Sequence, residues 1–225
     1  MIKITSAMIF AAGFGTRMGA LTSQTPKPLI PVAGRPMIDY AIDLLREAGI
    51  STIVANAHYL SDQIITHLGT RDVTVSLEED QILDTGGGLR SALPLLGDGP
   101  VITFNPDAIW LGPNPISELL SAWDTSMSAL LTLVPTARAY GTSHSGDFSL
   151  EHGAIARNGP YIYGGAQILQ THDLHRISTD VFSLNAYWDH LAKSGDLNGI
   201  AYSGDWCDIG TSDGLRTAEV LVSDV

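Results

Sequence analysis

The sequence contains a single cysteine, Cys207, so no disulfide bond can form within the chain. So little cysteine is typical of a reducing compartment, and we expect a cytoplasmic protein. No apolar run approaches the roughly 20 residues that span a bilayer. The apolar stretch Ala7–Ala12 is too short and badly placed for the core of a signal peptide. These absences exclude a disulfide scaffold and argue against a membrane-spanning protein.

Basic residues are also scarce, with 12 Lys and Arg against 24 Asp and Glu and a formal net charge of −12. Duplex DNA and anionic membranes both attract proteins with a cationic face, so we expect neither partner. The charge is uneven, because residues 1–75 hold 6 basic and 5 acidic side chains whereas residues 76–225 hold 6 and 19. A group that binds a polyanion is therefore expected near the N-terminus, and carboxylates further along could hold a divalent cation.

Hydrophobic residues make up 44% of the 225 residues, and no linker or repeat divides the chain, which predicts a single domain over residues 1–225. The first half alternates short apolar runs with stretches of helical periodicity. The expected strands are Ala7–Ala11, Ser51–Ala55, Val73–Leu77 and Val101–Phe104, and the expected helices run from Pro36 to Gly49, over Leu60–Leu68 and over Leu89–Leu96. This order predicts a doubly wound, mostly parallel, Rossmann-like α/β sheet.

The second half is less regular. The polar, glycine-rich stretch Thr136–Gly159 predicts a small β-hairpin excursion from the sheet. The other expected elements are strands at Ser128–Val134, Tyr161–Leu169 and Asn198–Tyr202, and helices at Ile116–Trp123, Val181–Ala192 and Asp213–Val222.

The strongest chemical signal is a glycine-rich loop, Ala11–Met18, directly after the first strand. Glycines at a strand end let backbone N–H groups approach phosphate oxygens. A dinucleotide-binding fingerprint would need a third glycine at Met18 and an acidic residue after the second strand. Neither is present, which disfavours a dehydrogenase. The loop instead continues to Lys27, which Pro26 and Pro28 hold on a stiff, extended segment.

The pattern from Gly13 to Pro36 reads Gly-x-Gly-Thr-Arg, then Pro-Lys-Pro-Leu-x-Pro-Val-x-Gly-x-Pro, and closely resembles the signature of the sugar-1-phosphate nucleotidylyltransferases. The resemblance implies their glycosyltransferase-A-like fold, with residues 1–110 binding a nucleoside triphosphate and residues 111–225 binding a sugar 1-phosphate. It implies that Lys27 is the catalytic cation and that Arg17 assists it. The nucleotide contacts that it implies in this loop are Ala11, Ala12, Gly13, Gly15, Thr16 and Arg17.

A second glycine-rich segment, Asp84–Gly88, precedes an expected helix. Three consecutive glycines favour close approach to a ligand, and a plain strand–helix turn is the alternative. The Asp-Thr-Gly-Gly-Gly form is similar to the N-acetylmuramate-1-phosphate uridylyltransferases of cell-wall recycling, which implies UTP and that acceptor. Other bases, and glucose, mannose and choline phosphates as acceptors, stay open. The nucleotide contacts implied here are Asp84, Thr85, Gly86, Gly87 and, after the fourth strand, Asn105.

Two carboxylates match the metal-binding motifs of the family. Asp107 follows an expected strand end, and Asp208 lies in a Trp-x-Asp-x-Gly-Thr segment. The resemblance implies that both hold Mg²⁺, that Asp107 takes part in catalysis and that Asp208 also contacts substrate; hard oxygen ligands suit this ion. Pro106 departs from the family, which usually has glycine there. If that position needs a positive φ, proline cannot adopt it, and the Asp107 side chain would point elsewhere.

The acceptor side is less well marked. Tyr163 and Gly165 lie in a segment that resembles the family's sugar-binding strand, which implies that they contact the sugar. Glu151 and His152 lie near the expected acceptor region without a clear motif, and we assign them no role. Arg157 is a candidate phosphate partner on composition alone.

The sequence also bears on a zinc site, on a non-catalytic function and on the oligomeric state. A zinc site is disfavoured, because the seven histidines form no cluster with cysteine. A non-catalytic nucleotide-sugar-binding protein, which Pro106 favours, is the rival to an enzyme. No exposed apolar stripe marks a dimer seam, so the oligomeric state is open and a monomer is among the alternatives.

Overall fold

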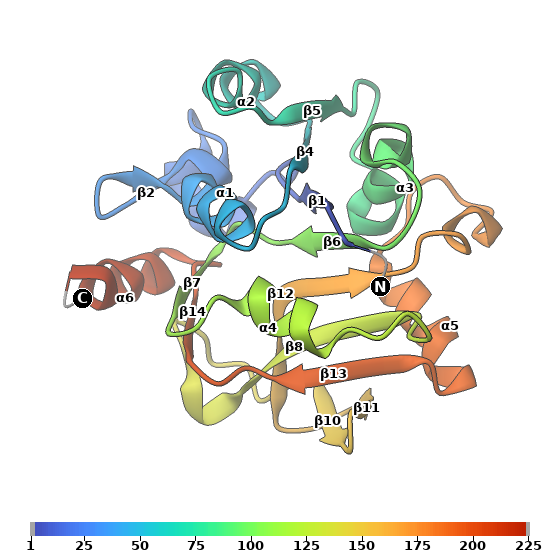
Figure 1. Cartoon of the computed structure of the whole chain (residues 1–225). Coiled ribbons are helices and arrows are strands. Elements are labelled where there is room, and N and C mark those ends of the chain that lie inside the picture. The colour runs from blue at the N-terminus through green and yellow to red at the C-terminus, as the bar shows by residue number, and fades with distance from the viewer. Residues whose placement is uncertain (1–2, 224–225) are drawn as a thin grey trace.

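The computed structural model describes residues 3–223, which fold around one nine-stranded sheet (Figure 1). Its strands are β1 (Ser6–Ile9), β4 (Thr52–Ala57), β5 (Thr74–Leu77), β6 (Val101–Phe104), β8 (Ala129–Pro135), β10 (Phe148–Glu151), β11 (Ala154–Arg157), β12 (Tyr161–Leu169) and β13 (Leu197–Ala201). Across the sheet they are ordered β10-β11-β13-β8-β12-β6-β1-β4-β5. Strands β6, β1, β4 and β5 are parallel, as are β13 and β8, whereas β12 is antiparallel to β6 and β8. The α/β sheet expected from the sequence is confirmed.

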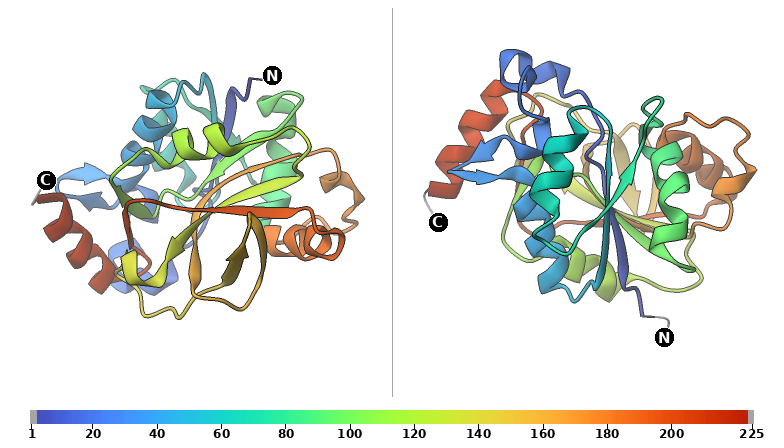
Figure 2. Two further views of the ribbon diagram at one scale, coloured as in Figure 1. Left: turned by 60° about the horizontal axis from the view of Figure 1, so that its bottom comes forward. Right: turned by 90° about the horizontal axis from the view of Figure 1, so that it is seen from above.

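Helices cover both faces of this sheet (Figure 2). They are α1 (Met37–Glu47), α2 (Ser61–Leu68), α3 (Asp84–Leu96), α4 (Pro115–Ala122), α5 (Leu184–Ser194) and α6 (Ser212–Ser223). Helices α1, α2 and α4 share a core with Ala7 and Ile9 of β1, whereas α3 and α5 share the opposite core with Met8. A strand buried on both faces needs apolar residues at successive positions, which is why β1 is a continuous apolar run.

A second sheet connects the two halves of the chain. It consists of β7 (Ala108–Leu111), β14 (Asp205–Asp208) and β9 (Ala139–Tyr140), with β14 in the middle. In the antiparallel register of β7 and β14, Asp208 lies opposite Ala108, and the Ile209 N–H donates to the Asp107 carbonyl at 2.9 Å. This pairing brings Asp208 next to Asp107. The sequence analysis did not predict β7 or β14, whose pairing joins segments about a hundred positions apart.

Two predicted helix starts are wrong. Helix α3 begins at Asp84 rather than Leu89, and Gly86–Gly88 lie inside its first turns. Glycine lowers helix propensity, but the packing of α3 overrides that preference here. Helix α5 begins at Leu184 rather than Val181, because the Ser183 side chain accepts a hydrogen bond from the Asn185 N–H and caps the helix.

The connecting segments hold more structure than the sequence indicated. The loop after β1 contains the 3₁₀ turns η1 (Thr16–Thr22) and η2 (Lys27–Leu29) and the short pair β2 (Pro31–Val32) and β3 (Arg35–Pro36); further 3₁₀ turns are η3 (Thr136–Arg138) and η4 (Leu174–Arg176). The expected hairpin is formed by β10 and β11, and it lies at the edge of the main sheet, where β11 pairs with β13. Within residues 3–223, no helix has the length and apolar character needed to cross a membrane.

Candidate active site

The carboxyl ends of β1, β4 and β6 meet around a cavity of about 270 Å³, which we call the first chamber. Ligands of doubly wound sheets bind at this edge. Its lining residues are Phe10, Ala11, Ala12, Gly13, Gly15, Lys27, Pro28, Asn56, Ile82, Asp84, Thr85, Asn105, Pro106 and Asp107. Most of the nucleotide contacts expected from the sequence therefore share one cavity.

The two glycines of the loop after β1 have different reasons to be glycine. Gly15 has a φ of 63°, and a Cβ there would lie 2.8 Å from the Cβ of Lys27, so only glycine lets the lysine stem pack against the loop. A Cβ on Gly13 would meet nothing within 4 Å. The fold alone does not require glycine at position 13, and the open space at this lining residue is available to a ligand.

Lys27 is held between two prolines in η2, and its side chain is only 11% exposed. Its Nζ donates to Asp107 Oδ2 at 2.5 Å, although the two residues lie 80 positions apart in the chain. Proline fixes its own φ, so Pro26 and Pro28 reduce the freedom of the backbone that presents the ammonium group. The lysine is thus placed in the chamber with its charge next to a carboxylate.

Asp208 faces the same point from β14. Burial raises the pKa of its carboxyl, and the neighbouring Asp107 carboxylate raises that pKa further, whereas the cations of Lys27 and Arg17 lower it. The Arg17 guanidinium lies beside Gly210, since a Cβ on that glycine would come within 3.0 Å of Arg17 Nη1. Four charged side chains, two of each sign, therefore gather at one side of the first chamber. Thr16, Arg17 and Asp208 themselves lie outside its lining.

The pair of aspartates fits a magnesium ion. Two mutually repelling carboxylates, partly buried, gain from a cation between them, and the Lys27 ammonium already neutralises Asp107. Magnesium is usually bound by one or two carboxylates together with waters and substrate phosphates. No group of three or more His, Cys, Asp or Glu side chains suited to a metal occurs in the described part of the chain, so the remaining ligands would come from substrate and water.

Pro106 does not turn Asp107 away from the site. None of Asn105, Pro106 and Asp107 has a positive φ, so the backbone here suits proline. The Asn105 N–H donates to the Gly165 carbonyl at 2.7 Å, and a Cβ on Gly165 would lie 2.8 Å from the Asn105 side chain. Gly165 thus supports Asn105 by close packing, and it lies outside the lining of the first chamber.

The glycines of α3 serve packing inside the protein. The N–H groups of Gly86 and Gly87 both donate to the Phe182 carbonyl, at 2.9 and 3.1 Å. A Cβ on Gly86 would collide with the Phe182 ring, and one on Gly87 with the Asp180 carbonyl. The structure therefore does not bring Gly86 and Gly87 to the lining of the first chamber, where the sequence placed them. Asp84 and Thr85, at the start of the same helix, do lie there.

A buried polar network, which sequence reasoning missed, connects the loop after β1 to the start of α3. Asn56 and Glu78 are 4% and 3% exposed. Asn56 Oδ1 accepts from the Ala11 N–H at 2.7 Å, and its Nδ2 donates to Glu78 Oε1 at 2.7 Å. Glu78 Oε2 accepts from the Leu83 N–H at 2.8 Å, next to α3. A polar residue within the apolar strand β4 was the signal that could have revealed this network.

A second chamber of about 250 Å³ adjoins the first. The two share Phe10, Asp84, Thr85 and Asn105, and the second is completed by Asp147, Phe148, Arg157, Tyr163, Gln167, Ser183, Leu184, Asn185 and Trp188. Of the two acceptor residues expected from the sequence, Tyr163 lines this chamber and Gly165 does not. Arg157 lines it as well.

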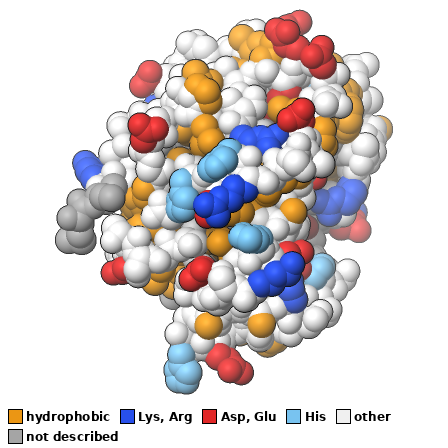
Figure 3. Space-filling view, turned by 90° about the vertical axis from the view of Figure 1, so that its right-hand side faces the viewer, with side chains coloured by type: hydrophobic (Ala, Val, Ile, Leu, Met, Phe, Trp, Pro, Cys, Tyr) orange, Lys and Arg blue, Asp and Glu red, His pale blue; other side chains and the backbone are white. Residues whose placement is uncertain are grey.

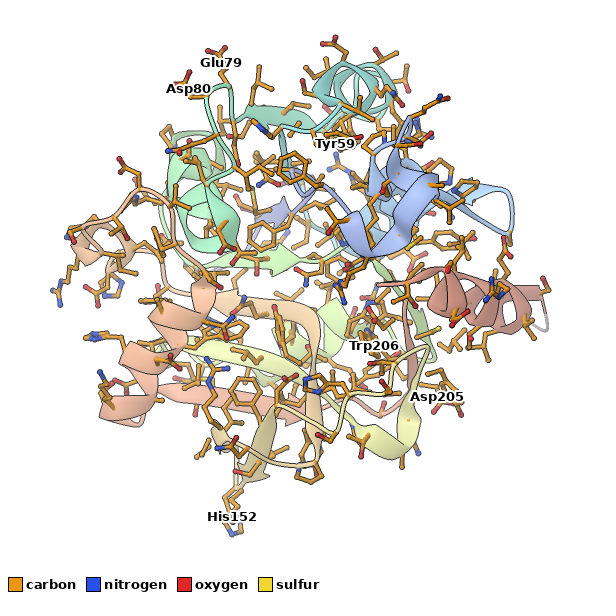
Figure 4. All side chains as sticks on the ribbon, turned by 180° about the vertical axis from the view of Figure 1, so that it is seen from behind. Tyr59, Glu79, Asp80, His152, Asp205 and Trp206 are labelled. Atoms are coloured by element: carbon orange, nitrogen blue, oxygen red, sulfur yellow. The ribbon has the colours of Figure 1, made fainter. Side chains whose placement is uncertain are left out.

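Two residues near the hairpin turn lie apart from both chambers. Glu151 and His152 are exposed, and Figure 4 shows His152 at the far end of the hairpin. Figure 4 also shows Trp206 on β14, and its Nε1 donates to the Gly164 carbonyl at 3.0 Å. This bond ties the strand that carries Asp208 to β12.

Comparison with known proteins agrees with this geometry. The family described as the MobA-like NTP transferase domain matches residues 7–157. The chain is 35% identical to the N-acetylmuramate alpha-1-phosphate uridylyltransferase of Caulobacter vibrioides, with 97% of both chains covered. It is 33% identical to the enzyme of the same name from Neisseria meningitidis serogroup B, over 96% of this chain and 97% of that one. The mannose-1-phosphate guanyltransferase of Aspergillus oryzae is 29% identical, and only 60% of its length is covered.

Solved structures share the fold at lower sequence identity. HddC from Yersinia pseudotuberculosis, in complex with GMP-PN, has a TM-score of 0.77 at 22% identity and covers 97% of this chain and 100% of its own. A UDP-glucose pyrophosphorylase in complex with UDP-glucose has a TM-score of 0.77 at 17% identity and covers 99% of each chain. The chain therefore belongs to the family of MobA-like NTP transferase domains and is an enzyme of the sugar-1-phosphate nucleotidyltransferase type.

Proposed function

We propose that this enzyme transfers a uridylyl group from UTP to N-acetylmuramic acid 1-phosphate in the presence of Mg²⁺ and releases pyrophosphate. The observation that carries the proposal is the hydrogen bond of 2.5 Å from Lys27 Nζ to Asp107 Oδ2. It lies beside Asp208, and the two bonded residues line the first chamber together with the glycine-rich loop. The choice of UTP and of this acceptor is supported by the Caulobacter and Neisseria relatives. The cytoplasmic location and the role in peptidoglycan recycling expected from the sequence belong to the same proposal.

In this reaction an anionic oxygen of the sugar 1-phosphate attacks the α-phosphorus of UTP. A new P–O bond forms as the bond to the β-phosphate oxygen breaks, and pyrophosphate leaves with the electron pair. The nucleophile is already ionised, so no general base is required. The protein has to align the two phosphates and stabilise the charge that develops between them. Lys27 and residues of the loop after β1 line the first chamber, which supports giving these two tasks to the lysine and to backbone N–H groups of that loop.

The other site residues divide between the two substrates. We propose that Ala11, Ala12, Gly13 and Gly15 contact the triphosphate and that Asp84, Thr85 and Asn105 contact the nucleoside. Arg17 and Thr16 lie outside the lining of the first chamber, and we propose that they contact the phosphates from there. The charge of Arg17 already lowers the pKa of Asp208. Asp107 and Asp208 would hold Mg²⁺, which screens the α-phosphate when bound. Gly86, Gly87 and Gly165 act through packing, and Tyr163 contacts the sugar.

These roles support the division of the chain into two halves. The first chamber is lined by residues 10–107 alone, within the nucleotide-binding half 1–110. The second takes most of its lining from residues 147–188, within the sugar-phosphate-binding half 111–225.

The test is to incubate the purified protein with UTP, N-acetylmuramic acid 1-phosphate and Mg²⁺ and to measure pyrophosphate and the mass of the nucleotide sugar. We expect both products, and neither after the metal is chelated. Binding of UTP without pyrophosphate release from any sugar 1-phosphate would identify a non-catalytic binding protein. Turnover of GTP with mannose 1-phosphate in place of the proposed pair would assign the protein to the reaction of its longer relatives.

A further inference from the structure

The second chamber carries one cationic side chain. Among its lining residues, all within the described part of the chain, Arg157 is the single Lys or Arg. It does not line the first chamber, and neither Lys27, Asp107 nor Asp208 lines the second. Arg157 therefore lies apart from the place where the two phosphates must meet, which argues against the phosphate contact that composition alone had suggested for it.

The Arg157 guanidinium is fixed from one side. Its Nε donates to Asp189 Oδ1 at 3.0 Å, and its Nη2 donates to the same oxygen and to Asn185 Oδ1, both at 2.8 Å. The group stacks over the rings of Phe148 and Trp188, with its carbon 4.9 and 5.6 Å from their centroids. No hydrogen bond from Nη1 to a described residue is present. A planar group held at Nε and Nη2, with Nη1 still able to donate, is oriented for one more acceptor.

A second polar atom of this chamber also lacks a partner. Tyr163 Oη is buried and makes no hydrogen bond with good geometry to any described residue. Burial raises the pKa of this hydroxyl, so it stays a neutral donor. Its neighbours Thr103 and Gln167 bond to each other at 2.9 Å, and Gln167 accepts from Trp188 Nε1 at 2.9 Å. A buried hydroxyl without a partner is costly unless a ligand or water completes it.

These groups fit an acidic, amide-bearing sugar. N-acetylmuramic acid differs from N-acetylglucosamine by a lactyl ether whose carboxylate is ionised near neutral pH. The protein carries a net charge of −12, and Asp84 and Asp147 also line this chamber, so the sugar's carboxylate needs a cation at close range. The face formed by α3, α5 and the segment between β12 and α5 is one on which Lys, Arg and His side chains gather (Figure 3).

We propose that Arg157 is the specificity-determining residue for the acceptor, and that its guanidinium binds the lactyl carboxylate in the second chamber. This inference rests on the proposed function. The aromatic rings of Phe148 and Trp188 supply the apolar wall for the N-acetyl sugar. Discrimination comes from a charge-assisted hydrogen bond that N-acetylglucosamine 1-phosphate cannot make.

The test measures kcat and KM for both acceptors, N-acetylmuramic acid 1-phosphate and N-acetylglucosamine 1-phosphate, at saturating UTP. For Arg157→Gln, we expect the ratio of the two kcat/KM values to fall by about 10- to 100-fold, the range for one charge-assisted hydrogen bond, mainly through KM of the acidic acceptor. Arg157→Lys keeps the charge but loses the planar fork, and its ratio should fall less. Misfolded protein lowers both values together and leaves the ratio unchanged, so the ratio isolates recognition from folding.

Arg176→Gln is the matched control, since Arg176 lies in η4, is 68% exposed and lines neither chamber. Its ratio should equal that of the wild type. If both Arg157 variants lose kcat/KM by the same factor for both acceptors, Arg157 binds the phosphate or supports the fold. If both variants keep the wild-type kcat/KM for both acceptors, Arg157 does not recognise the acceptor. Either result overturns this inference and leaves the proposed function unaffected. A wild type that uses sugar phosphates but not N-acetylmuramic acid 1-phosphate overturns the proposed acceptor, and the inference falls with it.

Discussion

The two chambers are built in different ways. The first is lined largely by short runs of residues in loops at the carboxyl ends of parallel strands, and several of these residues are small. The second takes most of its lining from residues 147–188, on or next to β10, β11, β12 and α5, and many of these residues have large or polar side chains. A chamber lined by small loop residues suits the proposed triphosphate, which is common to every donor. A chamber lined by larger side chains suits the proposed acceptor, whose identity can change when single residues change.

This contrast predicts which variants should affect all substrate pairs and which should affect single acceptors. Changes in the first chamber should affect every substrate pair alike, because the charge at the reacting phosphorus does not depend on the sugar. Changes in the second should affect acceptors unequally.

Lys27→Ala should have the largest effect. Removal of one well-placed cation costs about 10²–10³ in rate, so kcat should fall by at least that factor with every acceptor. Pyrophosphate release measures it, and Lys193→Ala, on an exposed part of α5, is the control. A loss confined to one acceptor would contradict the assignment of the first chamber to a step that all acceptors share.

Asp208→Asn should change the metal requirement. The carboxylate that this variant removes faces Asp107 across the expected magnesium position, so half-maximal activity should need about tenfold more Mg²⁺ or higher still. A Mg²⁺ titration of activity checks this result. Asp205→Asn, on the same strand, should titrate like the wild type, and an unchanged midpoint for Asp208→Asn would remove that residue from the metal site.

Glu78→Gln should weaken UTP binding without direct contact with the nucleotide. The new amide would place a donor against either the Asn56 amide or the Leu83 N–H, which costs about 1–3 kcal/mol and loosens the link between the loop after β1 and α3. We expect KM for UTP to rise about tenfold while the acceptor preference stays the same. Glu79→Gln, an exposed neighbour marked in Figure 4, should leave both unchanged. A shifted acceptor preference would contradict this positioning role.

Two glycine variants distinguish a glycine required for packing from one required for approach of the ligand. Gly87→Ala forces a Cβ against the Asp180 carbonyl and should cost about 1–3 kcal/mol, or several degrees in the unfolding midpoint. Gly13→Ala meets nothing within 4 Å and should keep the midpoint of the wild type while raising KM for UTP. Thermal unfolding and steady-state kinetics of both variants check this. The opposite pattern would mean that α3, not the loop after β1, approaches the phosphates.

The sequence was informative where function depends on consecutive residues. The loop after β1 and the Lys27 segment could be singled out directly, because their glycines and prolines match the spacing of a known family signature over consecutive residues. The alternation of strands and helices likewise predicted the first half of the sheet. Asp107 and Asp208 were found by motif, but the β7–β14 pairing that joins them was not, because it connects segments about a hundred positions apart.

The second chamber and the network of Asn56 and Glu78 could not be predicted in the same way. Their residues depend on contacts between distant elements, such as the stacking of Arg157 on Trp188 and the hydrogen bond from Ala11 to Asn56. The role of Gly86 and Gly87 was hidden for the same reason, since their neighbours Asp180 and Phe182 lie almost a hundred positions further along.

The most direct test of the central claim is a matrix of the nucleoside triphosphates against phosphorylated acceptors, with Mg²⁺ present and pyrophosphate measured. The acceptors should include the 1-phosphates of N-acetylmuramic acid, N-acetylglucosamine, glucose and mannose, and phosphocholine. We predict the highest kcat/KM for UTP with N-acetylmuramic acid 1-phosphate. A higher value for any other pair, or no pyrophosphate from any pair, would contradict it.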